Sequence, residues 1–347
     1  MRIRWFRLCA ALSIVAAMTG GLCKPTAAEP QKLTICMGPG AFFYIIHYVA
    51  EGGGFFKEEG LTTETIDVPS GPAQVAAIMG GSVDVGPLGL QLVVQASAQG
   101  GDMVAISAGY NAYPITLVLS NAAIKRSGIV GGMSIDEKVK RLHGLRVGVT
   151  TPGSGTDDMA RIIFRTRGMD ADREITIQPL GTTDNMLAAL QQNATDGFFY
   201  TSPIPELAVT RGLGQIVIEP LTGEVPEVKG VPYIILATSH ATLEKKPKLL
   251  LKAVRAYTRA MQFVQQKPDE ARRITRPFFK AMDEAVFDAA FDKYAKGLPT
   301  DPVITPDQLV KTVSFMNLVK KTPVSANYDD VVYPDLGREA ANEILGR

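Results

Sequence analysis

The stretch Ala77-Ile-Met-Gly-Gly-Ser-Val-Asp84 recurs 112 residues later as Ala189-Leu-Gln-Gln-Asn-Ala-Thr-Asp196. Within it Gly81 lines up with Asn193, and Gly and Asn are the residue types that best tolerate a left-handed conformation at the end of a helix. The same offset, within one residue, superposes two further pairs, Leu33 on Arg146 and Ser70 on Gly181. Since three landmarks agree on one offset, we predict two related halves rather than a chance match between two strand–helix units.

Strand-like and helix-like segments alternate around both copies of this stretch. In the first copy we expect strands over residues 33–37, 63–68, 83–85 and 103–108, and helices over 41–51, 73–79 and 90–98. In the second copy we expect strands over 146–150, 175–179 and 197–200, and helices over 156–167 and 183–192. Such alternation predicts an α/β fold with parallel sheets.

Two extended runs rich in β-forming residues, 110–120 and 230–239, follow the two copies. We interpret them as strands that cross between two lobes. Residues 29–113 and 229–347 would then form lobe one, and residues 114–228 lobe two.

The chain after the second run favours helices. Apolar residues recur with a helical period over 244–266, and Pro268 suits the first turn of the next helix. Thr305-Pro306-Asp307-Gln308 is a capping box with Pro at the first helical position, which predicts a helix through about Val319. We expect this tail to pack against lobe one.

The first 28 residues have the pattern of a secretory signal. Arg2, Arg4 and Arg7 precede a short apolar run, and small residues precede a cleavage site after Ala28. An uncleaved anchor, or a lipoprotein modified at Cys23, are the alternatives. Cleavage would leave 32 basic against 35 acidic residues, a balance that argues against nucleic acid as the partner. We expect a periplasmic protein.

Residues suited to catalysis or metal binding are few. Cys36 is the one cysteine after the signal and lies in an apolar strand, where a small core role is expected. His47, His143 and His240 have no metal-ligand spacing, and no Gly-x-Ser-x-Gly elbow occurs. We therefore expect no catalytic residue, no metal and no cofactor.

Three segments resemble a known family. Gly54-Phe-Phe-Lys-Glu-Glu-Gly-Leu61, Leu142-His-Gly-Leu-Arg-Val-Gly-Val149 and Pro247-Lys-Leu-Leu-Leu-Lys-Ala-Val254 are similar to segments of the nitrate/sulfonate/taurine and pyrimidine-precursor binding proteins of ABC importers. The resemblance covers about residues 30–270. It implies a type II periplasmic-binding fold with two lobes joined by two crossover strands. It also implies a ligand held between the lobes and a permease in the inner membrane as partner; we expect a monomer.

Ligands of open parallel sheets collect outside the carboxyl ends of the strands. The loops there are rich in Gly, Ser, Thr and Pro, which expose backbone N–H groups and hydroxyls beside helix N-termini. Such loops suit a small anion or a carbonyl-bearing ligand. Their aromatic residues are also consistent with a ligand that contains a ring. The candidate ligand-binding residues are Gly40, Phe42, Phe43, Tyr44, Ser70, Gly71, Leu88, Tyr110, Asn111, Thr151, Gly153, Ser154, Gly155, Thr156, Gly181, Thr182, Tyr200, Thr201 and Ser202.

The charged residues near the candidate loops limit the class of ligand. Asp157 and Asp158, in the first turn of the helix expected at 156–167, would oppose a multiply charged anion, so we favour a monoanion or a neutral polar solute. The candidate loops contain no Arg or Lys for a bidentate clamp on a carboxylate or sulfonate. Arg161 and Arg211 are two cations that could reach the cleft.

Two classes of function fit the fold. The first is a solute-binding protein that delivers a sulfonate, a small or aromatic carboxylate, a pyrimidine precursor or an oxyanion to an ABC importer. The second is an enzyme of the same fold, such as a pyrimidine-precursor synthase or a chorismate-type dehydratase. The secretion signal and the absence of the Cys-rich motif of the pyrimidine synthases favour the first class.

Overall fold

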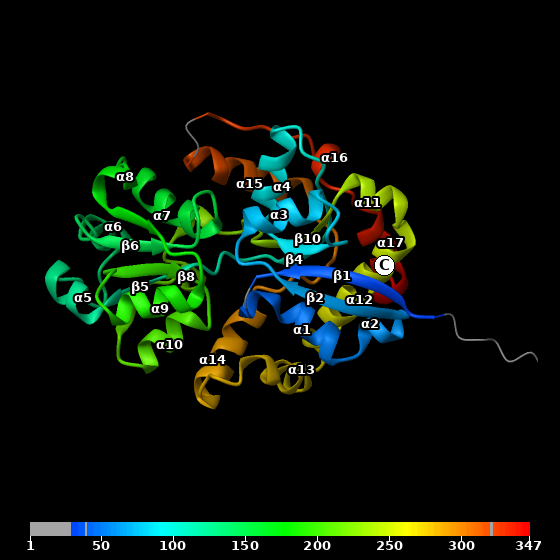
Figure 1. The fold of residues 1–347 in the computed structure, drawn as a ribbon, viewed down its shortest axis with the longest axis horizontal. Coiled ribbons are helices and arrows are strands. Elements are labelled where there is room, and N and C mark those ends of the chain that lie inside the picture. Colours follow the sequence, from blue (N-terminus) through cyan, green and yellow to red (C-terminus); the bar gives the residue numbers. More distant parts are fainter. Residues whose placement is uncertain (1–28, 39, 320–321) are drawn as a thin grey trace, which may run out of the picture.

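A computed structural model describes residues 29–38, 40–319 and 322–347, so the predicted signal segment lies outside the described residues. Two sheets stand side by side with helices around them (Figure 1). The first half of the fold carries strands β1 (Gln31–Met37), β2 (Leu61–Asp67), β3 (Gly86–Leu88), β4 (Val104–Tyr110) and β10 (Ile234–Thr238). The second half carries β5 (Thr116–Ser120), β6 (Arg146–Val149), β7 (Thr176–Pro179), β8 (Gly197–Tyr200) and β9 (Gly214–Ile218).

The two halves share one strand order. In the second half it is β7-β6-β8-β5-β9. In the first half β1 pairs with β2, and β10 lies between β3 and β4. A parallel bridge from Ile35 to Val85 joins these two groups, giving the order β2-β1-β3-β10-β4. The internal repeat seen in the sequence is therefore a repeat of topology.

The sheets are mixed, which corrects the expectation of parallel sheets. β10 runs antiparallel to β3 and β4, and β5 runs antiparallel to β8 and β9. The reason is that the chain enters β5 and β10 after crossing from the other half. It arrives at the edge where the parallel strands end, so it has to run against them. The strand expected at 83–85 lies slightly later, at Gly86–Leu88.

Helices flank both sheets. In the first half these are η1 (Phe42–Tyr44), α1 (Ile45–Gly52), α2 (Phe55–Glu58), α3 (Gly71–Met79) and α4 (Leu90–Ala98). In the second half they are α5 (Asn121–Ser127), α6 (Ile135–Lys140), α7 (Gly155–Arg165), α8 (Ala171–Glu174), α9 (Thr183–Gln191), α10 (Ile204–Thr210), η2 (Pro220–Thr222) and η3 (Pro226–Val228). After β10 follow α11 (His240–Lys245), α12 (Pro247–Gln266), α13 (Pro268–Thr275), η4 (Arg276–Phe279), α14 (Glu284–Ala295), α15 (Pro306–Val319), α16 (Tyr328–Val331) and α17 (Asp335–Leu345).

Local chemistry explains several of these boundaries. Gly81 and Asn193 both have positive φ, 70° and 55°, as their alignment predicted. Ser70 precedes α3 and Thr182 precedes α9 as N-caps, so Ser70 corresponds to Thr182 rather than to Gly181. The helix expected over 244–266 is divided before Pro247, because proline cannot donate the backbone hydrogen bond that would continue α11.

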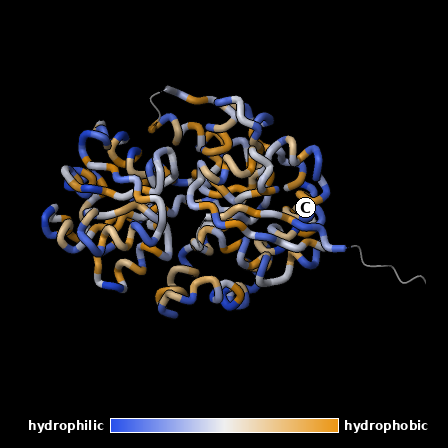
Figure 2. Tube along the Cα trace, viewed as in Figure 1, coloured by the Kyte–Doolittle hydropathy of each residue, from blue (hydrophilic) through white to orange (hydrophobic). Residues whose placement is uncertain are grey.

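Hydrophobic residues concentrate in the sheets and on the inner faces of the helices, whereas hydrophilic residues occupy the outer turns (Figure 2). The long helix α12 buries Leu250, Val254, Tyr257 and Met261 on one face, at the helical spacing expected for a packed helix. Within the described residues, no helix has both the length and the hydrophobicity to span a bilayer.

The C-terminal tail does not pack against the first half alone, which corrects the sequence-based expectation. Helix α15 packs against both α4 and α7, and so contacts both halves. A second contact crosses the seam, the line along which the two halves meet. There, Lys293 of α14 forms ion pairs with Glu206 of α10 and with Glu219, which follows β9. Figure 1 shows α15 at the top and α14 at the bottom of the region where the halves meet.

Candidate functional site

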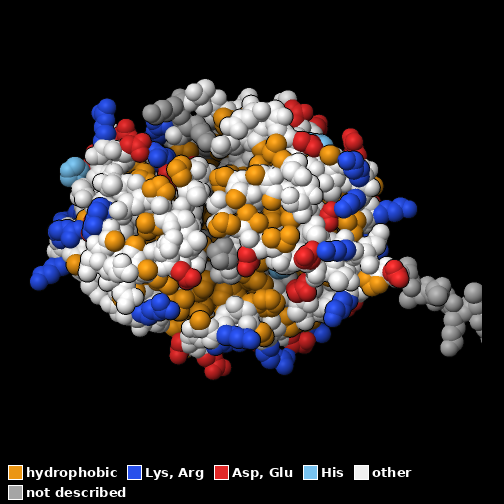
Figure 3. All heavy atoms as spheres, in the orientation of Figure 1, with side chains coloured by type: hydrophobic (Ala, Val, Ile, Leu, Met, Phe, Trp, Pro, Cys, Tyr) orange, Lys and Arg blue, Asp and Glu red, His pale blue; other side chains and the backbone are white. Residues whose placement is uncertain are grey.

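A small cavity of about 90 Å³ lies between the two halves, at the carboxyl ends of their parallel strands. In Figure 3, hydrophobic and uncharged atoms dominate the middle of the front face, while most charged side chains stand toward its rim. The lining residues are Gly38, Phe43, Tyr44, Pro69, Ser70, Gly71, Gln74, Leu88, Gly89, Gln91, Leu92, Thr150, Ser154, Gly155, Thr156, Tyr200, Thr201, Tyr233 and Ile234.

Three helices begin at this cavity. Their N-cap residues, Ser70 of α3, Gly89 of α4 and Ser154 of α7, all line it. The first N–H groups of a helix have no partner within the helix and carry a partial positive charge. The cavity therefore offers donors and a favourable potential to an oxygen atom of a ligand.

Three hydroxyls of the second half form a closed triangle at the start of α7. The Oγ1 of Thr150 lies 2.7 Å from Ser154 Oγ and 2.9 Å from Thr156 Oγ1, and the last two oxygens are 2.8 Å apart. The Oγ1 of Thr156 also accepts a hydrogen bond from the backbone N–H of Thr150 at 2.9 Å. All three residues are buried, so the triangle joins the end of β6 to the start of α7 and fixes this wall of the cavity.

Four aromatic rings also line the cavity. Phe43 contacts Tyr44 with ring centroids 4.3 Å apart and Tyr233 with centroids 5.1 Å apart, and Tyr200 enters from the end of β8. Burial raises the pKa of Tyr44 to about 12 and also raises the pKa values of Tyr200 and Tyr233. Their hydroxyls therefore stay protonated at neutral pH and serve as hydrogen-bond donors.

Two buried glutamines line the first half of the cavity. Gln74 of α3 hydrogen-bonds the hydroxyl of Tyr44, which also accepts from the backbone N–H of Gly38 at 3.2 Å. Gln91 of α4 is 4% exposed. Its amide lies over Gly89, 2.4–2.6 Å from the place that a Cβ at that glycine would occupy. Only glycine leaves room for this side chain.

None of the described residues that line the cavity carries a formal charge at neutral pH. Asp157 caps the start of α7 by accepting from the N–H of Gly153 at 2.9 Å, and it pairs with Arg161 at 3.1 Å. Arg161 also pairs with Asp172 of α8, so its guanidinium is held between α7 and α8, and it does not line the cavity. Arg211 ends α10 on the surface. Neither arginine reaches the cleft, in contrast to the suggestion from the sequence.

The structure brings ten of the sequence-predicted residues to the cavity: Phe43, Tyr44, Ser70, Gly71, Leu88, Ser154, Gly155, Thr156, Tyr200 and Thr201. It places the other nine elsewhere: Gly40, Phe42, Tyr110, Asn111, Thr151, Gly153, Gly181, Thr182 and Ser202.

Packing explains why several of the predicted residues do not line the cavity. The ring of Phe42 stacks on Phe279 with centroids 4.0 Å apart in the hydrophobic core. Tyr110 stacks on Tyr294, which does not line the cavity, and the N–H of Ser202 donates to the hydroxyl of the same Tyr294 at 3.0 Å. Thr182 is an exposed N-cap.

Nine lining residues were not predicted: Gly38, Pro69, Gln74, Gly89, Gln91, Leu92, Thr150, Tyr233 and Ile234. Pro69, Gly89 and Thr150 are each one residue from a predicted residue, and Gly38 is two residues from Gly40, so slightly longer loop predictions would have included them. Gln74, Gln91 and Leu92 lie within helices, and no local pattern indicates that they face a ligand.

The histidines and the cysteine lie away from the cavity. His47 is buried against the hydroxyl of Tyr257 at 3.0 Å, and burial lowers its pKa to about 4. Burial raises the pKa of Cys36 to about 12. Across the described ranges, no group of three or more His, Cys, Asp or Glu residues is arranged to hold a metal ion.

Comparison with known proteins agrees with this geometry. YtlA of Bacillus subtilis, named as a binding protein, is 23% identical over 348 residues, covering 98% of this chain and 99% of its own. A solved structure from Bordetella bronchiseptica RB50 matches with a TM-score of 0.79 at 24% identity, covering 92% of this chain and 99% of that one.

A second solved structure is a ligand-binding component of an ABC-type import system from Staphylococcus aureus, determined with zinc bound. It matches with a TM-score of 0.69 at 15% identity, covering 89% of this chain and 99% of that one. The expected periplasmic-binding fold is thereby confirmed. A family model described as NMT1-like family matches residues 26–276, and this chain therefore belongs to the NMT1-like family.

Proposed function

We propose that this protein is the extracytoplasmic solute-binding component of an ABC importer. It would capture one small solute in the cavity between its halves and deliver it to a permease in the inner membrane. The observation that carries the proposal is the cavity itself. Strand-end loops of both halves meet there, and they offer helix N-termini, hydroxyls, amides and aromatic rings.

Contacts between the halves support capture by closure. The backbone N–H of Phe42 donates to the carbonyl oxygen of Ser202 at 3.2 Å, and the hydroxyl of Tyr113 donates to the carbonyl oxygen of Gly155 at 3.3 Å. A solute between the loops would add its own contacts to both halves. We infer that the moving units are residues 29–113 with 229–347 and residues 114–228, joined at the β4–β5 and β9–β10 connections.

The chemistry of the side chains favours binding over catalysis. The thiol of Cys36 is fully buried and its raised pKa disfavours the nucleophilic thiolate. The tyrosine hydroxyls of the cavity are also held protonated, so they are poor bases. We therefore propose a binding role rather than an enzyme of the same fold.

The signal-like segment 1–28 fits this role, because a partner of an inner-membrane importer has to reach the far side of that membrane. We propose cleavage after Ala28, a periplasmic location and a monomeric mature protein. N-terminal sequencing of the exported protein tests the cleavage site.

A thermal-shift screen over sulfonates, carboxylates, amides, pyrimidines and oxyanions tests the function. A solute that binds the native state and not the unfolded state raises the melting temperature by mass action. We expect a solute that stabilises the protein, binds at one site by calorimetry, is recovered chemically unchanged, and compacts the protein in small-angle scattering. Turnover of the solute, or no stabilising solute in the whole screen, would refute the proposal.

A further inference from the structure

Gln91 is one of the cavity residues whose hydrogen-bonding capacity the fold leaves unused. Its side chain is buried and forms part of the cavity wall. Within the described residues its amide has no hydrogen-bond partner, whereas the neighbouring Gln74 hydrogen-bonds Tyr44. An amide that lies in a cavity wall without a protein partner can give its hydrogen bonds to a ligand or to water. Gln91 is therefore available to bind a ligand.

Comparison of the two repeated halves shows that Gln91 is not among the positions that recur. Positions that build the fold recur in both halves, as Gly81 and Asn193 do. At the 112-residue offset Gln91 corresponds to Pro203, which has no amide. The Gln91 side chain is thus no part of the repeated architecture, and a role in ligand recognition explains why it occupies the wall of a cavity.

The chemistry of the amide selects the ligand group. A primary amide presents one acceptor oxygen next to a donor nitrogen. Its complement is a group with a donor beside an acceptor, which a carboxamide or a lactam provides. A carboxylate offers acceptors only, so the oxygen of Gln91 would stay unmatched.

The charge of the cavity leads to the same ligand class. No described lining residue carries a cation, and a buried carboxylate without a counter-ion is costly. The N-termini of α3 and α4 have no acidic residue in the first turn, and they can still bind the oxygen of a neutral carbonyl group. The rings of Phe43, Tyr44, Tyr200 and Tyr233 provide walls for a flat apolar body.

We propose that Gln91 is the specificity-determining residue of this cavity and that it selects an uncharged ring compound bearing a carboxamide or lactam edge. Gly89 positions it, because a side chain at residue 89 would occupy the place of the Gln91 amide. This inference rests on the proposed solute-binding function and narrows it to one ligand class.

Calorimetry with matched probes tests the proposal on the mature protein. The probes are benzamide against benzoate, nicotinamide against nicotinate, and 2-pyridone. We expect at least one carboxamide or lactam to bind, with a Kd at least tenfold below that of its carboxylate counterpart. Tighter binding of the carboxylates, or no binding of any carboxamide or lactam probe, overturns the proposal.

Variants then assign the selectivity to the residue. Gln91→Met keeps the length and removes the amide, and Gly89→Ala displaces it; both should raise the Kd of the best probe at least tenfold. Gln99→Met, at the exposed end of the same helix, is the matched control and should leave the Kd unchanged. Melting curves establish that each variant is folded. An unchanged Kd in Gln91→Met and in Gly89→Ala also overturns the proposal.

The outcomes separate this inference from the function beneath it. If only carboxylates or sulfonates bind and compact the protein, the solute-binding function stands and the role of Gln91 is refuted. If no solute of the wider screen binds, the function itself fails.

Discussion

Asp84 and Asp196 make the same contact in the two halves of the fold. The Oδ2 of each accepts a hydrogen bond of 2.9 Å from the backbone N–H of the residue fifty positions earlier, Thr34 in the first half and Arg146 in the second. Each backbone N–H of the two aspartates returns a hydrogen bond of 2.9 Å to the carbonyl oxygen of that same residue. These hydrogen bonds tie β1 to the turn before β3 in the first half, and β6 to the turn before β8 in the second.

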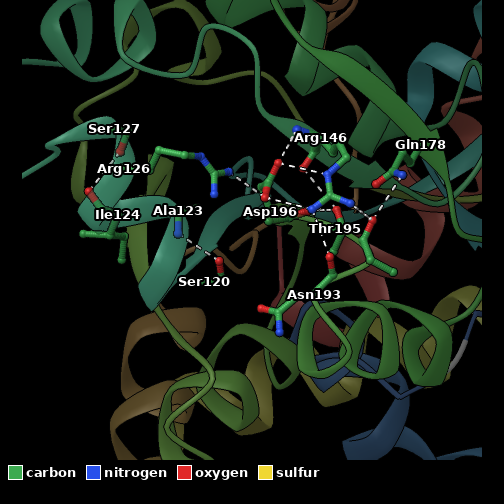
Figure 4. A network of polar contacts seen from close by, with 12 residues as sticks. Ser120, Ala123, Ile124, Arg126, Ser127, Arg146, Gln178, Asn193, Thr195 and Asp196 are labelled. Atoms are coloured by element: carbon green, nitrogen blue, oxygen red, sulfur yellow. Dashed lines mark hydrogen bonds and ion pairs between the residues drawn. The ribbon is translucent and has the colours of Figure 1, made fainter.

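A basic residue completes each contact. Lys246 lies 2.7 Å from Asp84, and Arg126 lies 2.7 Å from Asp196. Both cations follow the strand that crosses from the other half. In Figure 4, Arg126 and Arg146 approach Asp196 from different elements. The carboxylate thus joins three segments of one half, and this explains why the aspartate anchors the sequence repeat.

Asp196→Asn should lower the free energy of unfolding by about 1.5–3 kcal/mol, the range for hydrogen bonds to charged groups. The substitution keeps the shape of the side chain but leaves two arginines without their counter-ion. Urea unfolding at pH 7 measures the change. Asp67→Asn, at an exposed strand end, is the control and should change stability by less than about 0.5 kcal/mol. Equal effects of the two substitutions would contradict the role of Asp196.

The same contact predicts acid sensitivity. Burial opposes ionisation of Asp196, but hydrogen bonds from Arg146 and Arg126 outweigh it and lower its pKa from 3.8 to about 2. The folded state therefore gains stability from this carboxylate above pH 3.8 and loses it as the pH falls toward 2. Asp196→Asn should remove this part of the pH dependence, which urea midpoints between pH 5 and pH 2.5 would record.

His47 predicts a second loss of stability at milder acidity. Its pKa falls from 6.5 to about 4 on folding because the ring is buried. Between these values the unfolded chain binds a proton that the folded protein excludes, so stability falls as the pH drops from 6.5 toward 4. From pH 7 to pH 5 the expected loss is about 2 kcal/mol.

His47→Gln keeps a hydrogen-bonding group for Tyr257 and cannot be protonated, so it should lose less stability over the same interval. His143→Gln is the matched control, because His143 stands on the surface with 71% of its side chain exposed. If the wild type, His47→Gln and His143→Gln all show the same dependence of stability on pH, the burial argument for His47 is wrong.

Spacing and turn residues allowed the sequence to predict the architecture. The aspartates and the Gly81–Asn193 match mark turns whose conformation depends on a single residue, so local chemistry is sufficient to recognise them. The direction of β5 and β10 was not predictable in this way. It follows from where the chain crosses between the halves, which no local pattern records.

The site was predictable only where it consists of loops. Phe42 and Tyr44 stand two residues apart, yet Phe42 packs on Phe279 and Tyr44 lines the cavity. Gln91 lies in a buried apolar helix, between Leu90 and Leu92. Which side chain reaches the cavity depends on partners far along the chain, so the sequence does not distinguish core aromatics from cavity aromatics.

Lys293 is predicted to hold the halves together. Its ammonium group on α14 pairs with Glu206 and Glu219 of the second half, and all three side chains are partly buried. Lys293→Met should leave these carboxylates unpaired and lower the free energy of unfolding by about 1–3 kcal/mol, below the 3–5 kcal/mol of fully buried pairs because some solvent remains. Lys280→Met, on the surface, is the control.

Salt supplies an independent readout for this ion pair. Stability of the wild type should fall slightly as ionic strength rises from 0.01 to 1 M, and this fall should shrink in Lys293→Met. Scattering should also show a less compact average shape for the variant, since a contact across the seam is lost. A variant as stable and as compact as the wild type would show that α14 does not join the halves.

Thr156→Val tests whether the hydroxyl triangle builds the cavity wall. Valine has nearly the same shape, but it removes the oxygen that accepts from the buried N–H of Thr150 and contacts Ser154. The free energy of unfolding should fall by about 1–3 kcal/mol, the cost of an unsatisfied buried donor. The affinity for the best solute of the screen should fall as well, because the start of α7 is no longer fixed. Thr166→Val, at the other end of α7, removes a hydrogen bond to the carbonyl oxygen of Ile162 and one from the guanidinium of Arg167. Neither partner lines the cavity, so this variant should leave that affinity unchanged. If Thr166→Val weakens binding as much as Thr156→Val does, the effect comes from loosening the helix as a whole and the triangle has no special role.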